Sequence, residues 1–126
     1  MVQAYLEIFE IRMGARLRHS VDVPAELRHV ALPPLLLQSL VENAIRHGLE
    51  PKVGGGEVRI RAERGRGRLR VAVEDTGRGF QGERSGGTGL QNVRERLTSL
   101  YGERGKLVLE ENQPCGVRAI LEVPNA

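Results

Sequence analysis

Three short motifs of polar residues and glycines constrain the fold of this chain more than any other feature, because the first falls within an amphipathic helix, the second follows a strand and the third leads into another helix. They occupy residues 42–48, 75–79 and 86–90. Apolar residues recur at helical spacing before the first motif and after the third, and they alternate before the second. The chain must therefore combine at least two helices with a sheet and place polar groups on or beside these elements.

The composition describes one domain of modest size. The 126 residues are 40% hydrophobic and 28% charged, a globular mixture with enough apolar residues for a single core. Neither a membrane-length apolar run nor a signal-peptide layout is recognisable. Cys115 is the only cysteine, which excludes an internal disulfide and fits a reducing compartment. We expect a single domain over residues 1–126 that is cytoplasmic and does not itself contact a membrane.

The net charge of +3 raises the question of nucleic-acid binding. The densest basic cluster falls where two alternating strands would place it on a solvent-facing side of a sheet. Its members are Arg59, Arg61, Arg64, Arg66, Arg68 and Arg70. Two Tyr, two Phe and no Trp leave few rings on which bases could stack. We interpret the cluster as a solvated sheet face or a phosphate-friendly surface and expect no nucleic-acid partner.

The periodicity of the chain predicts a succession of strands and helices. Residues 16–23 alternate and stop at Pro24, which predicts an edge strand within an N-terminal strand region, residues 1–24; residues 5–11 fit helix and strand equally. Further elements are predicted as a helix from Pro33 to Gly48, strands over 57–63 and around 69–73, a helix from Leu90 to Gly102, and a hairpin of 106–111 with 117–123. The predicted fold class is an α/β two-layer sandwich, with a mixed, mostly antiparallel sheet and helices packed on one face.

The first motif places an unusual set of polar side chains on one side of its helix. At 100° per residue this side carries Ser39, Glu42, Asn43, Arg46, His47 and Glu50, while Leu37, Leu40, Val41, Ala44 and Ile45 take the other side and should pack on the sheet. An amide oxygen, an arginine one turn later and an imidazole suit a metal-bound polyphosphate. The alternatives are a solvated helix face and, for His47, a hydrogen bond to neighbouring backbone.

The second and third motifs suit an adenine base and phosphates. Asp75 can accept a hydrogen bond from an exocyclic amine, and Gly77 and Gly79 let the backbone approach the ring. An ordinary Asx turn is the alternative. Residues 86–89 lead into a helix whose free N–H groups and dipole favour phosphate oxygens. The third motif does not fit a Walker A or Rossmann loop, and a flexible linker is the alternative.

With all three motifs in this order, the chain resembles the catalytic, ATP-binding domain of sensor histidine kinases within the gyrase, chaperone, kinase and MutL (GHKL) ATPase superfamily. The matching N, G1 and G2 boxes are residues 40–48, 74–80 and 87–90, and residues 35–38 look like the LytS-type subfamily. The resemblance implies a Bergerat-type fold that binds ATP and Mg²⁺, with Asn43 on the metal and Asp75 on the adenine amine. The implied nucleotide contacts are Asn43, Arg46, His47, Asp75, Gly77, Gly79, Phe80, Gly87, Thr88, Gly89 and Leu90.

The implied function is that of the catalytic domain of a two-component sensor kinase. The γ-phosphate of Mg-ATP would pass to a histidine on a dimerisation domain of the same or a parent chain, and then to a response regulator. Glu42 and Asn43 are the candidate catalytic residues. Nothing in residues 1–126 reads as the phosphoacceptor domain, so we expect nucleotide binding without autophosphorylation, in the cytoplasmic portion of a membrane-anchored sensor. The segment between the second and third motifs is short, which predicts a reduced lid.

Two other functions compete with this interpretation. A stand-alone ATPase or an anti-sigma-type serine kinase would carry a glutamate as base four residues before Asn43, where this chain has Ser39. Glu42 lies about 100° around the helix from Asn43, so we expect weak intrinsic ATP hydrolysis, with Glu42 polarising the acceptor imidazole or acting through a water. A domain that binds partners but no nucleotide is disfavoured by the intact Asn43, Asp75 and glycines.

Overall fold

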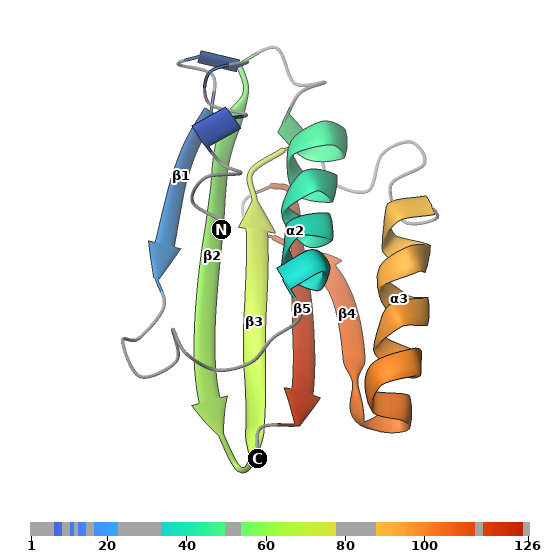
Figure 1. Ribbon diagram of the computed structural model, residues 1–126. Coiled ribbons are helices and arrows are strands. Elements are labelled where there is room, and N and C mark those ends of the chain that lie inside the picture. The colour runs from blue at the N-terminus through green and yellow to red at the C-terminus, as the bar shows by residue number, and fades with distance from the viewer. Residues whose placement is uncertain are drawn as a thin grey trace.

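The computed structural model describes residues 7, 8, 11, 13, 14, 17–22, 34–49, 54–77, 88–112 and 115–124. The elements are β1 (Leu17–Asp22), α2 (Pro34–Asn43), the π-helical η3 (Ala44–Leu49), β2 (Gly56–Gly65), β3 (Arg68–Asp75), α3 (Thr88–Tyr101), the 3₁₀ turn η5 (Gly102–Arg104), β4 (Lys106–Glu111) and β5 (Val117–Pro124). The strands form one sheet in the order β1-β2-β3-β5-β4. Helices α2 and α3 cover the same face of that sheet (Figure 1). The predicted α/β two-layer sandwich is confirmed.

The strand pairing makes the sheet mixed but mostly antiparallel, as predicted. Strand β1 runs parallel to β2 and forms one edge of the sheet, so the predicted edge strand is confirmed. The other three pairs of neighbouring strands are antiparallel. Strands β2 and β3 form a hairpin whose turn residues Arg66 and Gly67 have φ of 53° and 73°. Two left-handed residues in succession match the twist of a tight hairpin.

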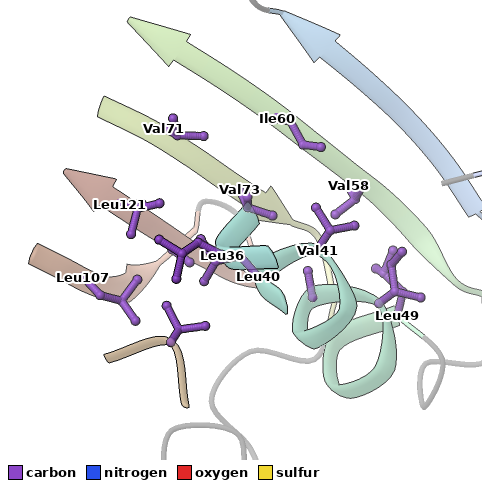
Figure 2. Close-up of a cluster of buried hydrophobic side chains, with 14 of the residues drawn as sticks. Leu36, Leu40, Val41, Leu49, Val58, Ile60, Val71, Val73, Leu107 and Leu121 are labelled. Carbon is purple, nitrogen blue, oxygen red and sulfur yellow. The ribbon is translucent and has the colours of Figure 1, made fainter. Parts of the chain in front are cut away.

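The core lies between α2 and the sheet (Figure 2). Alternation places every second strand residue on the helix-covered side, and helical spacing supplies the matching apolar stripe of α2. The labelled side chains that meet there are Leu36, Leu40 and Val41 of α2, Leu49 of η3, Val58 and Ile60 of β2, Val71 and Val73 of β3, Leu107 of β4 and Leu121 of β5, all of them buried. Each fully buried Leu, Ile or Val contributes about 2 kcal/mol to folding.

Both predicted helices are present, but the first differs in its last turns. The expected helix continues to Leu49, yet its hydrogen bonding changes from α to π after Asn43. Leu36 is fully buried and Leu37 only partly, so the apolar side is rotated slightly from the expected one. Helix α3 ends at Tyr101, and Gly102 follows with φ of 60°, which confirms the predicted stop. The described residues 7, 8, 11 and 13 are helical.

The uncovered face of the sheet carries the arginine-rich surface predicted from the sequence. Glu74 is 8% exposed, and its two oxygens face Arg61 at 3.6 Å and Arg118 at 2.8 Å. Arg118 also lies 3.2 Å from Glu110 on the neighbouring strand. The arginines here are therefore matched by carboxylates, as a solvated sheet face requires. Within the described part of the chain, no helix has the length and apolar character needed to cross a membrane.

Candidate functional site

Elements from all three sequence motifs meet at one end of the sheet. Figure 1 shows α2 running up to η3 at the end where β3 finishes and where α3 begins. The turn between β4 and β5 lies at this same end, and η3 packs against β2 and β3. The end of the first helix, the end of the strand and the start of the second helix therefore form one region.

Asn43 is the last residue of α2 and is only 6% exposed. Polar side chains in such positions are normally held by hydrogen bonds or recruited for a ligand. The helix changes to π geometry at the next residue, and π-helical turns are rare and frequently occur at functional sites. The alternative of a solvated helix face therefore does not hold for Asn43, which is buried at the junction.

Glu42 and Arg46 form an ion pair across one turn of the same helix. Arg46 Nε lies 3.6 Å from Glu42 Oε1, and the two side chains are 55% and 45% exposed. A half-exposed pair of this kind contributes little to stability, so either group can exchange its partner for a ligand at small cost. The backbone of His47 belongs to η3, and the position of its side chain lies outside the described part of the structure.

Asp75 is the last residue of β3 and is fully buried. Its Oδ1 accepts a hydrogen bond from the Gly77 backbone N–H at 2.9 Å and another from the Val117 N–H at 3.4 Å. The bond from Gly77 is the Asx turn that the sequence left open as an alternative. This turn does not compete with a binding role, because it fixes the orientation of the buried carboxylate.

Thr76 ties the end of β3 to the start of β2. Its backbone N–H donates to the Glu57 carbonyl oxygen at 3.0 Å, and its Oγ1 accepts from the Glu57 N–H at 2.9 Å. A Cβ built on the neighbouring Gly56 would stand 2.5 Å from Thr76 Oγ1 and 2.9 Å from Leu49 Cδ2. Gly56 thus permits η3, β2 and the end of β3 to approach one another closely.

The β4–β5 turn contributes residues that the sequence analysis missed. Asn112 Nδ2 donates to the Asp75 carbonyl oxygen at 2.9 Å, and Cys115 Sγ donates to the Thr76 carbonyl oxygen at 3.4 Å. Gly116 has φ of 99° and lies so close to Asp75 that a Cβ would overlap its carbonyl oxygen. The one available signal was an asparagine and a glycine between two alternating segments, which marks a turn but not its contact with Asp75.

The third motif is described only from its helical part onward. Thr88, Gly89 and Leu90 form the first turn of α3, and this turn contains no acidic residue. The first N–H groups of a helix lack partners within it, so this turn offers donors and a positive dipole end. Gly79, Phe80 and Gly87, together with the predicted short lid, lie outside the described residues, as do the side chains of residues 88–90.

The donor chemistry of the region suits a Mg²⁺ ion that is bound together with a nucleotide. No group of three or more His, Cys, Asp and Glu side chains in the described ranges could hold a metal ion by itself. Mg²⁺ that travels with a nucleotide is commonly held by one or two protein oxygens, with phosphates and waters completing its shell. The amide oxygen of buried Asn43 fits that requirement. Among the described residues, His, Cys, Asp and Glu side chains form no metal site on their own.

Comparison with known proteins identifies relatives along the whole chain. The family described as histidine kinase-, DNA gyrase B-, and HSP90-like ATPase matches residues 32–126. Sensor histidine kinase YesM of Bacillus subtilis is 36% identical over 129 aligned residues, covering 98% of this chain and 22% of YesM. Sensor protein LytS of Enterococcus faecalis is 30% identical, covering 98% of this chain and 23% of LytS. The chain thus spans less than a quarter of these relatives, which confirm the LytS-type resemblance.

Solved structures support the fold. The catalytic domain of histidine kinase ThkA matches with a TM-score of 0.73 at 20% identity, covering 98% of this chain and 90% of that chain. ThkA in complex with the response regulator protein TrrA matches with a TM-score of 0.71 at 21% identity, covering 99% of this chain and 39% of that chain. At these identities the likeness concerns the arrangement of strands and helices, which is that of a histidine kinase catalytic domain.

Proposed function

This chain belongs to the family of histidine kinase-, DNA gyrase B- and HSP90-like ATPases, and from that premise we propose that it is the catalytic domain of a two-component sensor histidine kinase. Membership of this ATPase family implies ATP binding. The proposed reaction transfers the γ-phosphate of Mg-ATP to a histidine on a separate domain. One observation carries the proposal: Asn43 and Asp75 are buried and are the last residues of α2 and β3, which both finish at the end of the sheet where α3 begins.

Asp75 is the proposed adenine contact. Its carboxylate accepts a hydrogen bond from the 6-amino group of adenine, a position at which a 6-oxopurine carries an oxygen instead. The two backbone N–H groups on Oδ1 hold the carboxylate in one orientation, which favours recognition of a planar base. Gly77 is buried beside it, and we propose that Gly77, Gly79 and Phe80 form the adjoining wall of the base pocket.

Asn43 is the proposed Mg²⁺ ligand and the start of α3 the proposed phosphate site. When bound, Mg²⁺ neutralises charge on the β- and γ-phosphates during transfer. Gly87, Thr88, Gly89 and Leu90 present the N–H groups and dipole of α3 to phosphate oxygens. Arg46, which pairs with Glu42 at 3.6 Å, moves to a phosphate when nucleotide binds, and His47 contacts the nucleotide from the same turn.

The transfer step is a displacement at phosphorus. A ring nitrogen of the acceptor histidine forms a bond to the γ-phosphorus while the bond to the β–γ bridging oxygen breaks, and ADP leaves. Glu42 polarises the incoming imidazole, directly or through a water. Positioning and charge neutralisation account for most of the catalysis, because phosphoryl transfer requires little covalent chemistry from the protein.

The proposed partners follow from the relatives. YesM and LytS are sensor proteins much longer than this chain, so we propose that the acceptor histidine resides on a dimerisation domain of the same or a parent chain. The ThkA complex with TrrA supports a response regulator as the downstream partner. We propose residues 1–126 as one catalytic domain in the cytoplasmic portion of a membrane-anchored sensor.

The alternative of a stand-alone ATPase or an anti-sigma-type serine kinase is not favoured. Ser39 occupies the place of a catalytic glutamate on α2 and lines a small hollow of about 150 Å³ with Asn92 and Val93 of α3. A serine there cannot act as a carboxylate base, so attack by water should be slow. The relatives at 30% and 36% identity are sensor proteins, in agreement with the kinase assignment.

The proposed function can be tested in a chimera. This chain replaces the region of YesM that it matches, and the chimera is incubated with γ-labelled ATP and Mg²⁺. We expect label that is labile in acid and stable in alkali, as for phosphohistidine. Asn43→Ala should reduce labelling by about two orders of magnitude. Thr98→Val, which removes an exposed contact on α3, should not. An unlabelled chimera that is folded would contradict the proposal.

A further inference from the structure

The segment around the β4–β5 turn contacts both the main chain and the side chain of Asp75. Asn112 Nδ2 donates to the Asp75 carbonyl oxygen at 2.9 Å, while the Val117 N–H donates to its carboxylate at 3.4 Å. The Asn112 N–H in turn donates to the Gly116 carbonyl oxygen at 3.0 Å, which closes the turn. One short segment therefore contacts the proposed base-recognising residue from two directions.

Asn112 supplies a hydrogen-bond donor to Asp75 at the point where the pairing of β3 with β5 ends. The pairing between β3 and β5 ends at Glu74 and Arg118, so Asp75, which still pairs with Val58 of β2, lies one residue beyond the β3–β5 ladder. Its carbonyl oxygen is buried and needs a donor, which the Asn112 amide supplies. Gly116 makes this approach possible, because a Cβ there would overlap the same carbonyl oxygen. A side chain 37 residues away thus helps to hold the Asp75 main chain at the strand end.

We propose that Asn112 is a positioning residue for base recognition and sets the preference of the site for purines with a 6-amino group. This inference rests on the proposed function, in which Asp75 accepts from the adenine amine. Hydrogen-bonded recognition of a single polar group depends on the placement of its partner, and loosening that partner weakens discrimination. Asn112 does not touch the base, so its effect reaches the ligand only through Asp75.

The proposed phosphate contacts lie on elements other than the β4–β5 turn. Nucleotide binding can therefore distinguish a positioning role of Asn112 from a purely structural one. The proposed phosphate contacts come from η3 and the start of α3, whereas the hydrogen bonds to Asp75 described above come from Gly77, Asn112 and Val117, which belong to neither element. Loss of Asn112 should therefore weaken binding of ATP and spare binding of inosine triphosphate, which carries an oxygen at position 6. A general loosening of the fold would weaken both nucleotides alike.

The test is calorimetric titration of the chain with a non-hydrolysable ATP analogue and with the matching inosine analogue, both with Mg²⁺. Asn112→Asp keeps the size of the side chain and replaces the donating amide by an acceptor. Asn112→Ala removes the group altogether. Thr98→Val is the matched control, because Thr98 Oγ1 also donates to a backbone carbonyl, that of Arg94 at 3.1 Å, on α3. Melting temperatures are recorded for every variant.

We expect the preference for adenine over hypoxanthine to fall about tenfold in both Asn112 variants, with inosine binding nearly unchanged and Thr98→Val like the parent. An equal loss for both nucleotides, or an unchanged preference, would overturn the role of Asn112 and leave the proposed function standing. A parent chain that binds neither nucleotide would overturn the proposed function and this inference with it.

Discussion

The two ends of the sheet both contain turns with a left-handed glycine, but only one end leaves that glycine room for a side chain. At the β2–β3 hairpin, Gly67 has φ of 73° and nothing lies within 4 Å of a Cβ built on it. At the opposite end, Gly116 has φ of 99° and the same atom would overlap the Asp75 carbonyl oxygen. Gly67 allows the left-handed backbone of the hairpin turn, whereas Gly116 also allows the β4–β5 turn to lie against Asp75.

The burial of polar residues also differs between the two ends of the sheet. The hairpin end carries exposed residues, among them Arg64 and Arg66, whose polar groups can hydrogen-bond with water. The other end buries Asn43 and Asp75, two polar groups that need specific partners. We infer that substitutions lower the free energy of unfolding little at the hairpin and much more at the site. The stabilities of matched variants at the two ends measure that difference.

The largest effect is expected for Gly116→Ala. The new Cβ would force the β4–β5 turn away from Asp75 and would also occupy a left-handed conformation, so the free energy of unfolding should fall by about 3 kcal/mol. Gly67→Ala, the matched change at the hairpin, has only the conformational cost of about 1 kcal/mol. Urea titration of both variants measures the difference. Equal losses would contradict the contrast between the two ends.

A smaller effect is expected for Gly56→Ala. The added Cβ would meet Thr76 Oγ1 and Leu49 Cδ2, so the side chain of Leu49 in η3 and that of Thr76, just after β3, must shift, and the free energy of unfolding should fall by about 2 kcal/mol. Gly65→Ala at the other end of β2 has open space and should lose nothing, because alanine lowers the entropy of the unfolded chain. If both variants melt at the parent temperature, the close packing at the site end is not needed for stability.

The smallest effect is expected for Arg70→Ala near the hairpin. Arg70 Nη1 lies 3.6 Å from Glu63 Oε1, and the two side chains are 49% and 72% exposed. Exposed pairs of this kind contribute at most about 0.5 kcal/mol, and salt screens them. Thermal unfolding at low and high salt would reveal a larger contribution, which would mean that the hairpin end is less tolerant than we infer.

The sheet and the helices could be predicted because their periodicities are local. Alternation of Val58 and Ile60, and later of Val71 and Val73, is a property of neighbouring residues, and so is the helical spacing of Val93 and Leu97. The stop at Gly102 is likewise local. Asp75 at a strand end could be located for the same reason.

The remaining features depend on contacts between distant residues. The π-helical turn after Asn43 has no period of its own within a short window, so the sequence predicted an ordinary helix there. Asn112 reaches Asp75 across 37 residues, and nothing near Asn112 indicates that contact. The pairing of Glu42 with Arg46 has a local spacing, yet spacing alone does not say whether the arginine faces a carboxylate or a phosphate.

The central claim is that the region around Asp75 and Asn43 binds Mg-ATP, and calorimetric titration tests it most directly. The chain and its Asp75→Asn variant are titrated with a non-hydrolysable ATP analogue, with and without Mg²⁺, after circular dichroism has shown that both are folded. We predict micromolar binding by the parent chain that strengthens with Mg²⁺ and is lost in Asp75→Asn. Unchanged affinity in that variant would contradict the adenine assignment, and absence of binding by the parent chain would contradict the nucleotide site itself.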